Sequence, residues 1–75
     1  MKWNPAHDRG QQQVAAALTR DHRPYWWVRW SYPNRWWEAY FTGPATVAPL
    51  RSTDPVDLSQ RMRSTLKELA KGRLR

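Results

Sequence analysis

Residues Tyr25–Gly43, YWWVRWSYPNRWWEAYFTG, decide the fold of this chain, because they hold five of the six tryptophans, all three tyrosines and the only phenylalanine. Aromatic and β-branched residues favour the half-buried surface of a pleated strand. Between two such runs, Tyr32-Pro33-Asn34-Arg35 supplies turn-forming residues. Pro-Asn lacks the Asn-Gly signal of a tight two-residue turn, so we predict a β-hairpin closed by a loop of four residues.

The pairing of the two strands follows from the side chains that it brings together. One register places only apolar pairs on one face: Trp26 with Phe41, Val28 with Ala39, and Trp30 with Trp37. The same register places an aromatic pair and an ion pair on the other face: Trp27 with Tyr40, and Arg29 with Glu38. A shift of one residue would mix the two faces. We therefore expect this register, with Trp30 and Trp37 buried and Trp27 available to a partner.

The residues before the hairpin predict one short helix. Residues 1–8 show no periodicity and are interpreted as an N-terminal arm, whereas residues 9–22 are rich in helix formers. The weak apolar side of this helix consists of Val14, Ala17 and Leu18. Asp8 is the expected N-cap, and Pro24 ends the helix by residue 22, because proline disfavours helical geometry at the residue before it.

After the hairpin, Gly43-Pro44 is a turn signal, and residues 45–51 are extended in character. We predict a third antiparallel strand here, beside the second strand of the hairpin. Pro49 requires this strand to lie at the edge of the sheet, because proline has no N–H group to donate. In the expected register Val47 lies on the sheet face opposite the apolar face. The residues on the apolar face are Thr46, Ala48 and Leu50.

The clearest helical pattern runs over residues 54–71, followed by a basic tail at residues 72–75. Asp54 is the expected N-cap, Pro55 suits the first helical position, and Gly72 suits the end of the helix. An apolar stripe at helical spacing consists of Leu58, Met62, Leu66 and Leu69. A basic stripe on another side consists of Arg63, Lys67 and Lys71.

Together these elements predict one small α+β domain: a helix, a three-stranded antiparallel β-meander and a C-terminal helix (α-β-β-β-α). A two-stranded hairpin is marginally stable alone, so the C-terminal helix is expected to cover its apolar face. The order of elements resembles that of the double-stranded-RNA-binding domain, and the sheet with its C-terminal helix resembles the arm-binding domains of tyrosine integrases. The motifs of the first family are absent, since Gly43-Pro44 leads into Ala45-Thr46 and the last helix opens with Asp54-Pro55-Val56-Asp57. The sequence therefore assigns no family.

Charge and composition narrow the classes of partner. The 75 residues carry a formal net charge of +7 and no cysteine, which excludes a disulfide framework and a thiolate metal site. Ten of the thirteen basic residues are arginines, which suit phosphate, although a GC-rich genome would also favour arginine. No apolar run approaches the roughly 20 residues that span a bilayer, so we expect a cytoplasmic protein without a signal peptide or membrane contact.

The sheet face away from the C-terminal helix is the first candidate site. It would carry Tyr25, Trp27, Arg29, Trp36, Glu38, Tyr40 and Val47. Three explanations are open for so much exposed aromatic surface. The first helix covers this face, or a protein partner or second copy of the chain binds it, or unpaired bases stack on it while Arg29 and Arg35 contact phosphate.

The basic end of the chain is the second candidate site, and it consists of Arg63, Lys67, Lys71, Arg73 and Arg75. A basic stripe is usually a solvated surface, but acidic residues are scarce here, which favours contact with phosphate groups. Such contacts carry no sequence information. Base recognition would therefore fall to Arg29, Asn34 or Arg35 in the hairpin.

We expect a small non-enzymatic protein that binds nucleic acid, DNA in preference to RNA, as a regulatory or accessory factor of a bacterium or phage. In this interpretation the protein uses its basic C-terminal helix and its hairpin of aromatic and arginine residues. The alternative is a protein-interaction module, an adaptor or inhibitor, that binds one partner or forms a homodimer through Tyr25, Trp27, Trp36 and Tyr40. No enzyme class is indicated, because His7-Asp8 and Asp21-His22 match no metal or acid–base motif, and no cofactor is implied.

Overall fold

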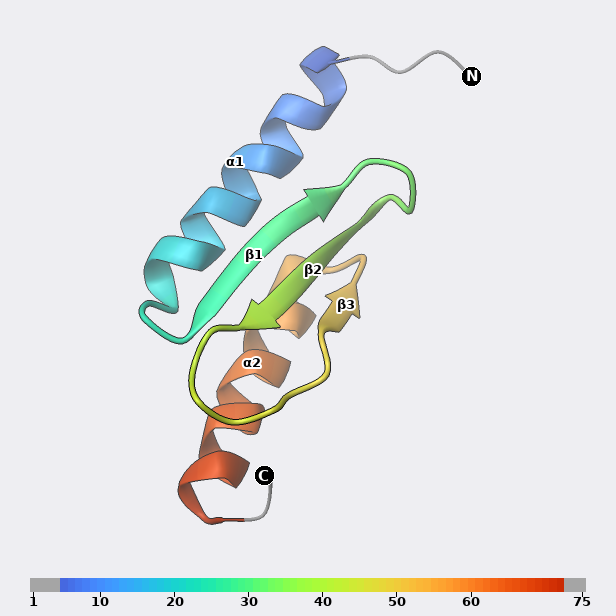
Figure 1. The fold of residues 1–75 in the computed structure, drawn as a ribbon. Helices are drawn as coiled ribbons and strands as arrows, with labels where there is room; N and C mark the ends of the chain where they lie inside the picture. The colour runs from blue at the N-terminus through green and yellow to red at the C-terminus, as the bar shows by residue number, and fades with distance from the viewer. Residues whose placement is uncertain (1–4, 73–75) are drawn as a thin grey trace.

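A computed structural model describes residues 5–72, with side chains from residue 8 onward (Figure 1). The elements in chain order are α1 (Pro5–Asp21), β1 (Trp26–Ser31), β2 (Trp36–Phe41), β3 (Leu50–Ser52) and α2 (Pro55–Ala70). The strands form one antiparallel sheet in the order β1-β2-β3. The predicted α+β class and element order are therefore confirmed.

The hairpin has the predicted register. The facing pairs are Trp26 with Phe41, Trp27 with Tyr40, Val28 with Ala39, Arg29 with Glu38, and Trp30 with Trp37. Residues 32–35 form the predicted four-residue loop, in which the Arg35 N–H donates to the Ser31 carbonyl at 2.8 Å. Arg35 has a φ of 58°, in the left-handed region that costs a non-glycine residue about 1–2 kcal/mol.

The third strand is shorter than predicted, and its register differs. Ala39 faces Leu50, whereas the sequence predicted that it would face Ala48. The strand begins directly after Pro49 and lies at the edge of the sheet, as the missing N–H of proline requires.

The segment at residues 44–49 is not a strand, so the alternation expected for it is wrong. Val47 packs against the core and does not lie on the open face, whereas Thr46 and Ala48 are exposed. The physical reason is that strand alternation holds only where the backbone pairs with a neighbour, and this segment leaves β2 after the turn at Gly43. A Cβ atom on Gly43 would lie 2.5 Å from the Phe41 ring, so a side chain at this position would have to displace that ring.

α2 has the predicted ends and the predicted apolar side. Asp54 accepts a hydrogen bond from the Val56 N–H at 2.9 Å, and Gly72 follows the helix with a φ of 74°. Leu58 and Met62 are fully buried against the sheet, and Leu66 is partly buried. The core beneath α1 and α2 consists of Ala15, Trp26, Val28, Trp37, Ala39, Leu58 and Met62.

α1 begins earlier than predicted, at Pro5, so residues 5–8 are helical and do not form an arm. Asp8 is therefore not the N-cap: it lies in the first turn, and its side chain is buried. Proline suits the first helical position because its missing N–H would have no partner there. The helix ends at Asp21, before Pro24, as predicted. The rest of the predicted arm, with Trp3, lies outside the described residues.

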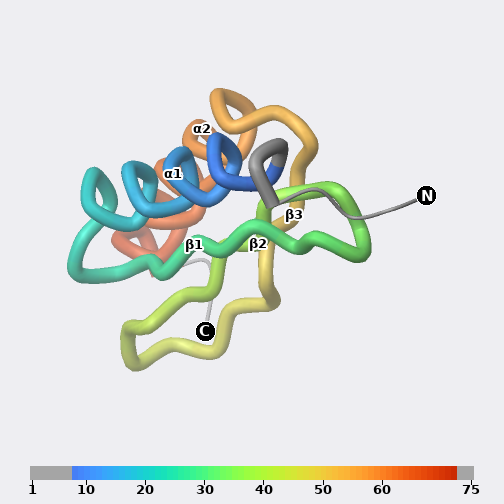
Figure 2. Tube along the Cα trace, turned by 90° about the horizontal axis from the view of Figure 1, so that it is seen from above, coloured from blue at the N-terminus to red at the C-terminus, as the bar shows by residue number. Residues whose placement is uncertain are grey.

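Both helices lie on the same face of the sheet, as Figure 2 shows. Ala15 of α1 belongs to the same core as Leu58 and Met62 of α2. The Trp37 indole, which points into this core, donates to the Gln11 carbonyl at 2.9 Å. His22 Nε2 lies 2.8 Å from the Ser59 hydroxyl of α2. The interpretation in which the first helix covers the second sheet face is therefore wrong.

The side of α1 that meets the rest of the protein is mostly polar. Its members recur at helical spacing, Asp8, Gln11, Ala15 and Thr19, and His22 continues the stripe just after the helix. The Val28 N–H donates to the Thr19 hydroxyl at 2.8 Å, so this backbone group at the outer edge of β1 has a hydrogen-bond partner. The predicted apolar side at Val14, Ala17 and Leu18 lies next to this stripe and is only partly buried. Polar contacts therefore fix the position of α1 as much as apolar burial does.

Candidate functional site

The uncovered sheet face, which we call the open face, has three rows of side chains across the strands. The register defines the rows as Trp27 with Tyr40, then Arg29 with Glu38 and Arg51, then Ser31 with Trp36. Aromatic side chains therefore lie at both ends of the open face, and a charged row lies between them. Both described helices are on the other side of the sheet (Figure 2).

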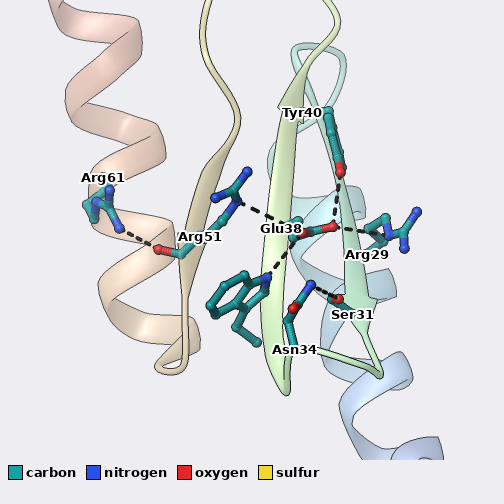
Figure 3. Close-up of polar contacts among 8 residues, drawn as sticks. Arg29, Ser31, Asn34, Glu38, Tyr40, Arg51 and Arg61 are labelled. Carbon is teal, nitrogen blue, oxygen red and sulfur yellow. Dashed lines mark hydrogen bonds and ion pairs between the residues drawn. The ribbon is translucent and has the colours of Figure 1, made fainter.

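Glu38 is the centre of the open face, and four side chains converge on it (Figure 3). The Trp36 indole N–H donates to Oε2 at 3.1 Å, and the Tyr40 hydroxyl donates to Oε1 at 3.0 Å. Arg29 Nε lies 3.4 Å from Oε1, and Arg51 Nε lies 4.0 Å from Oε2. The residue is only 8% exposed. A buried carboxylate with this many donors fixes the positions of the surrounding rings and guanidinium groups.

These contacts shift the pKa values of the two acidic groups in opposite directions. The hydrogen bond from Trp36 lowers the pKa of Glu38 below its ordinary value of 4.5, helped by Tyr40, Arg29 and Arg51 and opposed by burial. The hydrogen bond to Glu38 raises the pKa of Tyr40 above 10.0, because it holds the phenol protonated. Glu38 is therefore ionised and Tyr40 neutral at pH 7.

The predicted stacking residues Trp27, Trp36 and Tyr40 do share the open face. Trp27 is 50% exposed, and its ring centroid lies 5.6 Å from that of Tyr40. The Arg51 guanidinium lies over the Trp36 ring, 5.6 Å from its centroid. Tyr25 was predicted to join them, and this placement is wrong: its ring stacks on Phe41, and it lines a cavity of about 500 Å³ beside Leu66 and Leu69. Tyr25 precedes β1, so strand alternation does not apply to it.

Arg35, predicted to bind nucleic acid, makes an ion pair within the protein. Its Nη1 lies 2.6 Å from the Asp8 carboxylate, and its guanidinium lies over the Trp30 ring at 5.1 Å. This pair joins the hairpin loop to the first turn of α1. Trp30, predicted to be buried, is only partly buried. It lies one residue before the end of β1, and the Arg35 guanidinium covers its ring.

The basic residues of α2 lie apart from the open face. Arg63, Lys67 and Lys71 are exposed, as predicted. Arg63 contributes to lowering the pKa of His22 below 6.5, after the larger effect of burial and against the effect of Asp21. Arg73 and Arg75 lie outside the described residues.

Arg51 is the member of the open face that sequence analysis did not identify. The predicted register of the third strand placed Arg51 opposite Trp36, whereas the structure places it opposite Glu38. The signal was available, because an oppositely charged pair across neighbouring strands favours one register over another. Arg61 of α2 reinforces this register, since its Nη1 donates to the Arg51 carbonyl at 2.6 Å (Figure 3).

Other site types find little support in the described part of the chain. Residues 5–72 contain no group of three or more side chains that could hold a metal ion. No described helix is long and apolar enough to cross a membrane.

Comparison of the chain with protein-family models, curated proteins and solved structures finds no match. The chemistry of the two surfaces is therefore the basis for any functional proposal.

Proposed function

We propose that this protein binds nucleic acid without catalysing a reaction, and that the basic stripe of α2 contacts the phosphate backbone. The observation that carries this proposal is the alignment of Arg63, Lys67 and Lys71, all exposed, on one helix of a chain with net charge +7. Contacts of this kind supply affinity for any polyanion and no sequence information.

The geometry of the stripe suits a regular row of phosphates. Successive members are one helical turn apart, about 6 Å along the axis, so the three span about 12 Å. Duplex DNA carries one negative charge per roughly 1.7 Å of axis, so a row of this length faces several phosphates. Lys67 lies in the last turn of α2 and Lys71 is its C-cap, so these cations also complement the negative end of the helix dipole.

The test is a binding titration with duplex and single-stranded DNA and RNA at two salt concentrations. Lys67→Gln combined with Lys71→Gln should lower duplex affinity and reduce the slope of log K against log salt by about 1.8, since each lost contact removes about 0.9. Gln13→Glu combined with Arg20→Gln is the matched control. It lowers the net charge equally, at exposed positions on α1.

The control variant should keep the slope of the natural protein. Absence of binding to every nucleic acid at low salt would refute the proposal. Equal losses in the two double variants would show that net charge matters and that the stripe on α2 does not.

A further inference from the structure

We infer that the open face is a stacking site for unpaired bases, so that the protein contacts single-stranded nucleic acid there in addition to the backbone contacts of α2. This inference rests on the proposed function and adds a ligand class and a second surface to it. The site consists of Trp27, Arg29, Trp36, Tyr40 and Arg51. Glu38 contacts the last four of these, and Trp27 packs against the Tyr40 ring.

The spacing of the three rows fits a strand that lies across the sheet. Tyr40 and Trp36 are four residues apart on β2, which is about 13 Å along a strand. One base stacking at the Trp27 and Tyr40 end and another at the Trp36 end, where the Arg51 guanidinium lies over the ring, would place the intervening backbone over the charged row. The guanidinium groups of Arg29 and Arg51 lie in that row, and their side chains are 48% and 59% exposed.

The charge of this row is complementary to phosphate. Two guanidinium groups share the single Glu38 carboxylate, so the row has a net charge of +1. Each guanidinium has five N–H donors, and its contact with Glu38 is made through Nε. The outer N–H groups of an exposed arginine remain in position to meet a phosphate oxygen.

Glu38 acts as a positioning residue for the aromatic rings. It accepts hydrogen bonds from the edges of Trp36 and Tyr40, so the polar atoms of these rings are engaged at the sheet surface. A ring held by its edge loses little further freedom when a base stacks on its face, which lowers the entropic cost of binding. A stacking surface of this kind tolerates any base, because every base has a π-face.

The arrangement is less suited to a protein partner or a second copy of the chain. Protein interfaces enrich arginine but are depleted of carboxylates at their centre, and they place most polar groups at the rim. The open face has the Glu38 carboxylate at its centre, between Arg29 and Arg51, with aromatic rings at both ends. A duplex is also a poor ligand, because its bases are already stacked inside the helix and only unpaired bases can be splayed onto aromatic side chains.

The experiment compares a single strand with a duplex of the same sequence, using Trp27→Ala and a matched control. Trp27→Ala should weaken single-strand binding about 5- to 150-fold, which corresponds to the loss of one stacked base. Its salt slope and its duplex affinity should not change. Val56→Ala removes a side chain that is 64% exposed on α2, and it should alter neither affinity. Trp27→Phe retains an aromatic ring and should recover part of the single-strand affinity.

The outcomes separate this inference from the proposed function. If the natural protein binds both forms and Trp27→Ala and Trp36→Ala, both folded, bind the single strand normally, the inference is wrong and the proposed function stands. If the natural protein binds no nucleic acid at low salt, the proposed function fails first. If Trp27→Ala changes the oligomeric state and leaves single-strand binding intact, the open face is a self-association surface and the inference is refuted.

Discussion

The two faces of the sheet are formed by the same strands and both carry tryptophan, yet they are stabilised in different ways. On the covered face Trp26, Val28 and Trp37 are buried beneath two helices, where removal of apolar surface from water supplies the free energy. On the open face the aromatic rings remain partly exposed, and the Glu38 carboxylate orders Trp36 and Tyr40 through hydrogen bonds and Arg29 through an ion pair. Strand alternation therefore decides which tryptophans join the core and which lie on the surface.

The largest expected effect is on the covered face. Leu58→Ala should lower the free energy of unfolding by about 2–5 kcal/mol, because it leaves a cavity beneath the sheet where Leu58 is fully buried. Val56→Ala, on the exposed side of the same helix, should stay within about 0.5 kcal/mol. Urea unfolding of both variants provides the measurement, and equal destabilisation would show that the orientation of α2 is wrong.

The contact between α1 and the edge of β1 should have the next largest effect. Thr19→Val keeps the shape of the side chain but leaves the Val28 N–H without its acceptor, which should cost about 1–3 kcal/mol. Thr19→Ser retains the hydroxyl and should recover most of this loss. Hydrogen exchange at the Val28 amide is a local check: unchanged protection in Thr19→Val would mean that the threonine does not hold the strand edge.

The open face should be sensitive to acid through Glu38. Because the folded protein lowers the pKa of Glu38, the carboxylate stabilises the fold above 4.5, and this contribution is lost as the pH falls through the lowered value. Glu38→Gln should therefore be less stable by on the order of 1 kcal/mol near pH 7, since it loses charge-assisted hydrogen bonds. The stability difference between the two proteins should shrink as the pH falls below 4.5.

Thermal or urea unfolding across this range provides the measurement for Glu38→Gln. His22 has a lowered pKa as well, but it is present in both proteins and cancels in the difference. A loss of stability in Glu38→Gln that is the same at every pH would show that the charge of Glu38 contributes nothing to the network.

The smallest expected effect on stability comes from an aromatic ring of the open face. Trp27→Ala should cost about 0.2–1 kcal/mol, because it removes one cross-strand contact with Tyr40 from a half-exposed position. Acrylamide quenching should also fall in this variant, since an accessible indole has been removed. A loss of stability as large as that of Leu58→Ala would contradict the distinction between the two faces.

The sequence determined the hairpin, its loop and its register, because alternation excludes a shift of one residue, which would place Val28 opposite Glu38, and the loop length fixes which of the remaining pairings forms. It also determined α2, through the cap at Asp54 and the apolar stripe that contains Leu58 and Met62. Both signals are local, so no information from distant parts of the chain was needed. The predicted site residues Trp27, Trp36 and Tyr40 follow from the same alternation.

Only the tertiary structure decided where α1 lies, how β3 pairs and which arginines are engaged within the protein. The contacts that hold α1 include those of Asp8 and Thr19 in the helix and of His22 just after it, which are polar, so hydrophobic periodicity does not reveal them. Two of their partners lie far away in the chain: Arg35 for Asp8, and Ser59 for His22. Polar contacts of this kind depend on distances between elements, which no local pattern encodes. For the same reason only the positions of both helices, on the other side of the sheet, show which face is open.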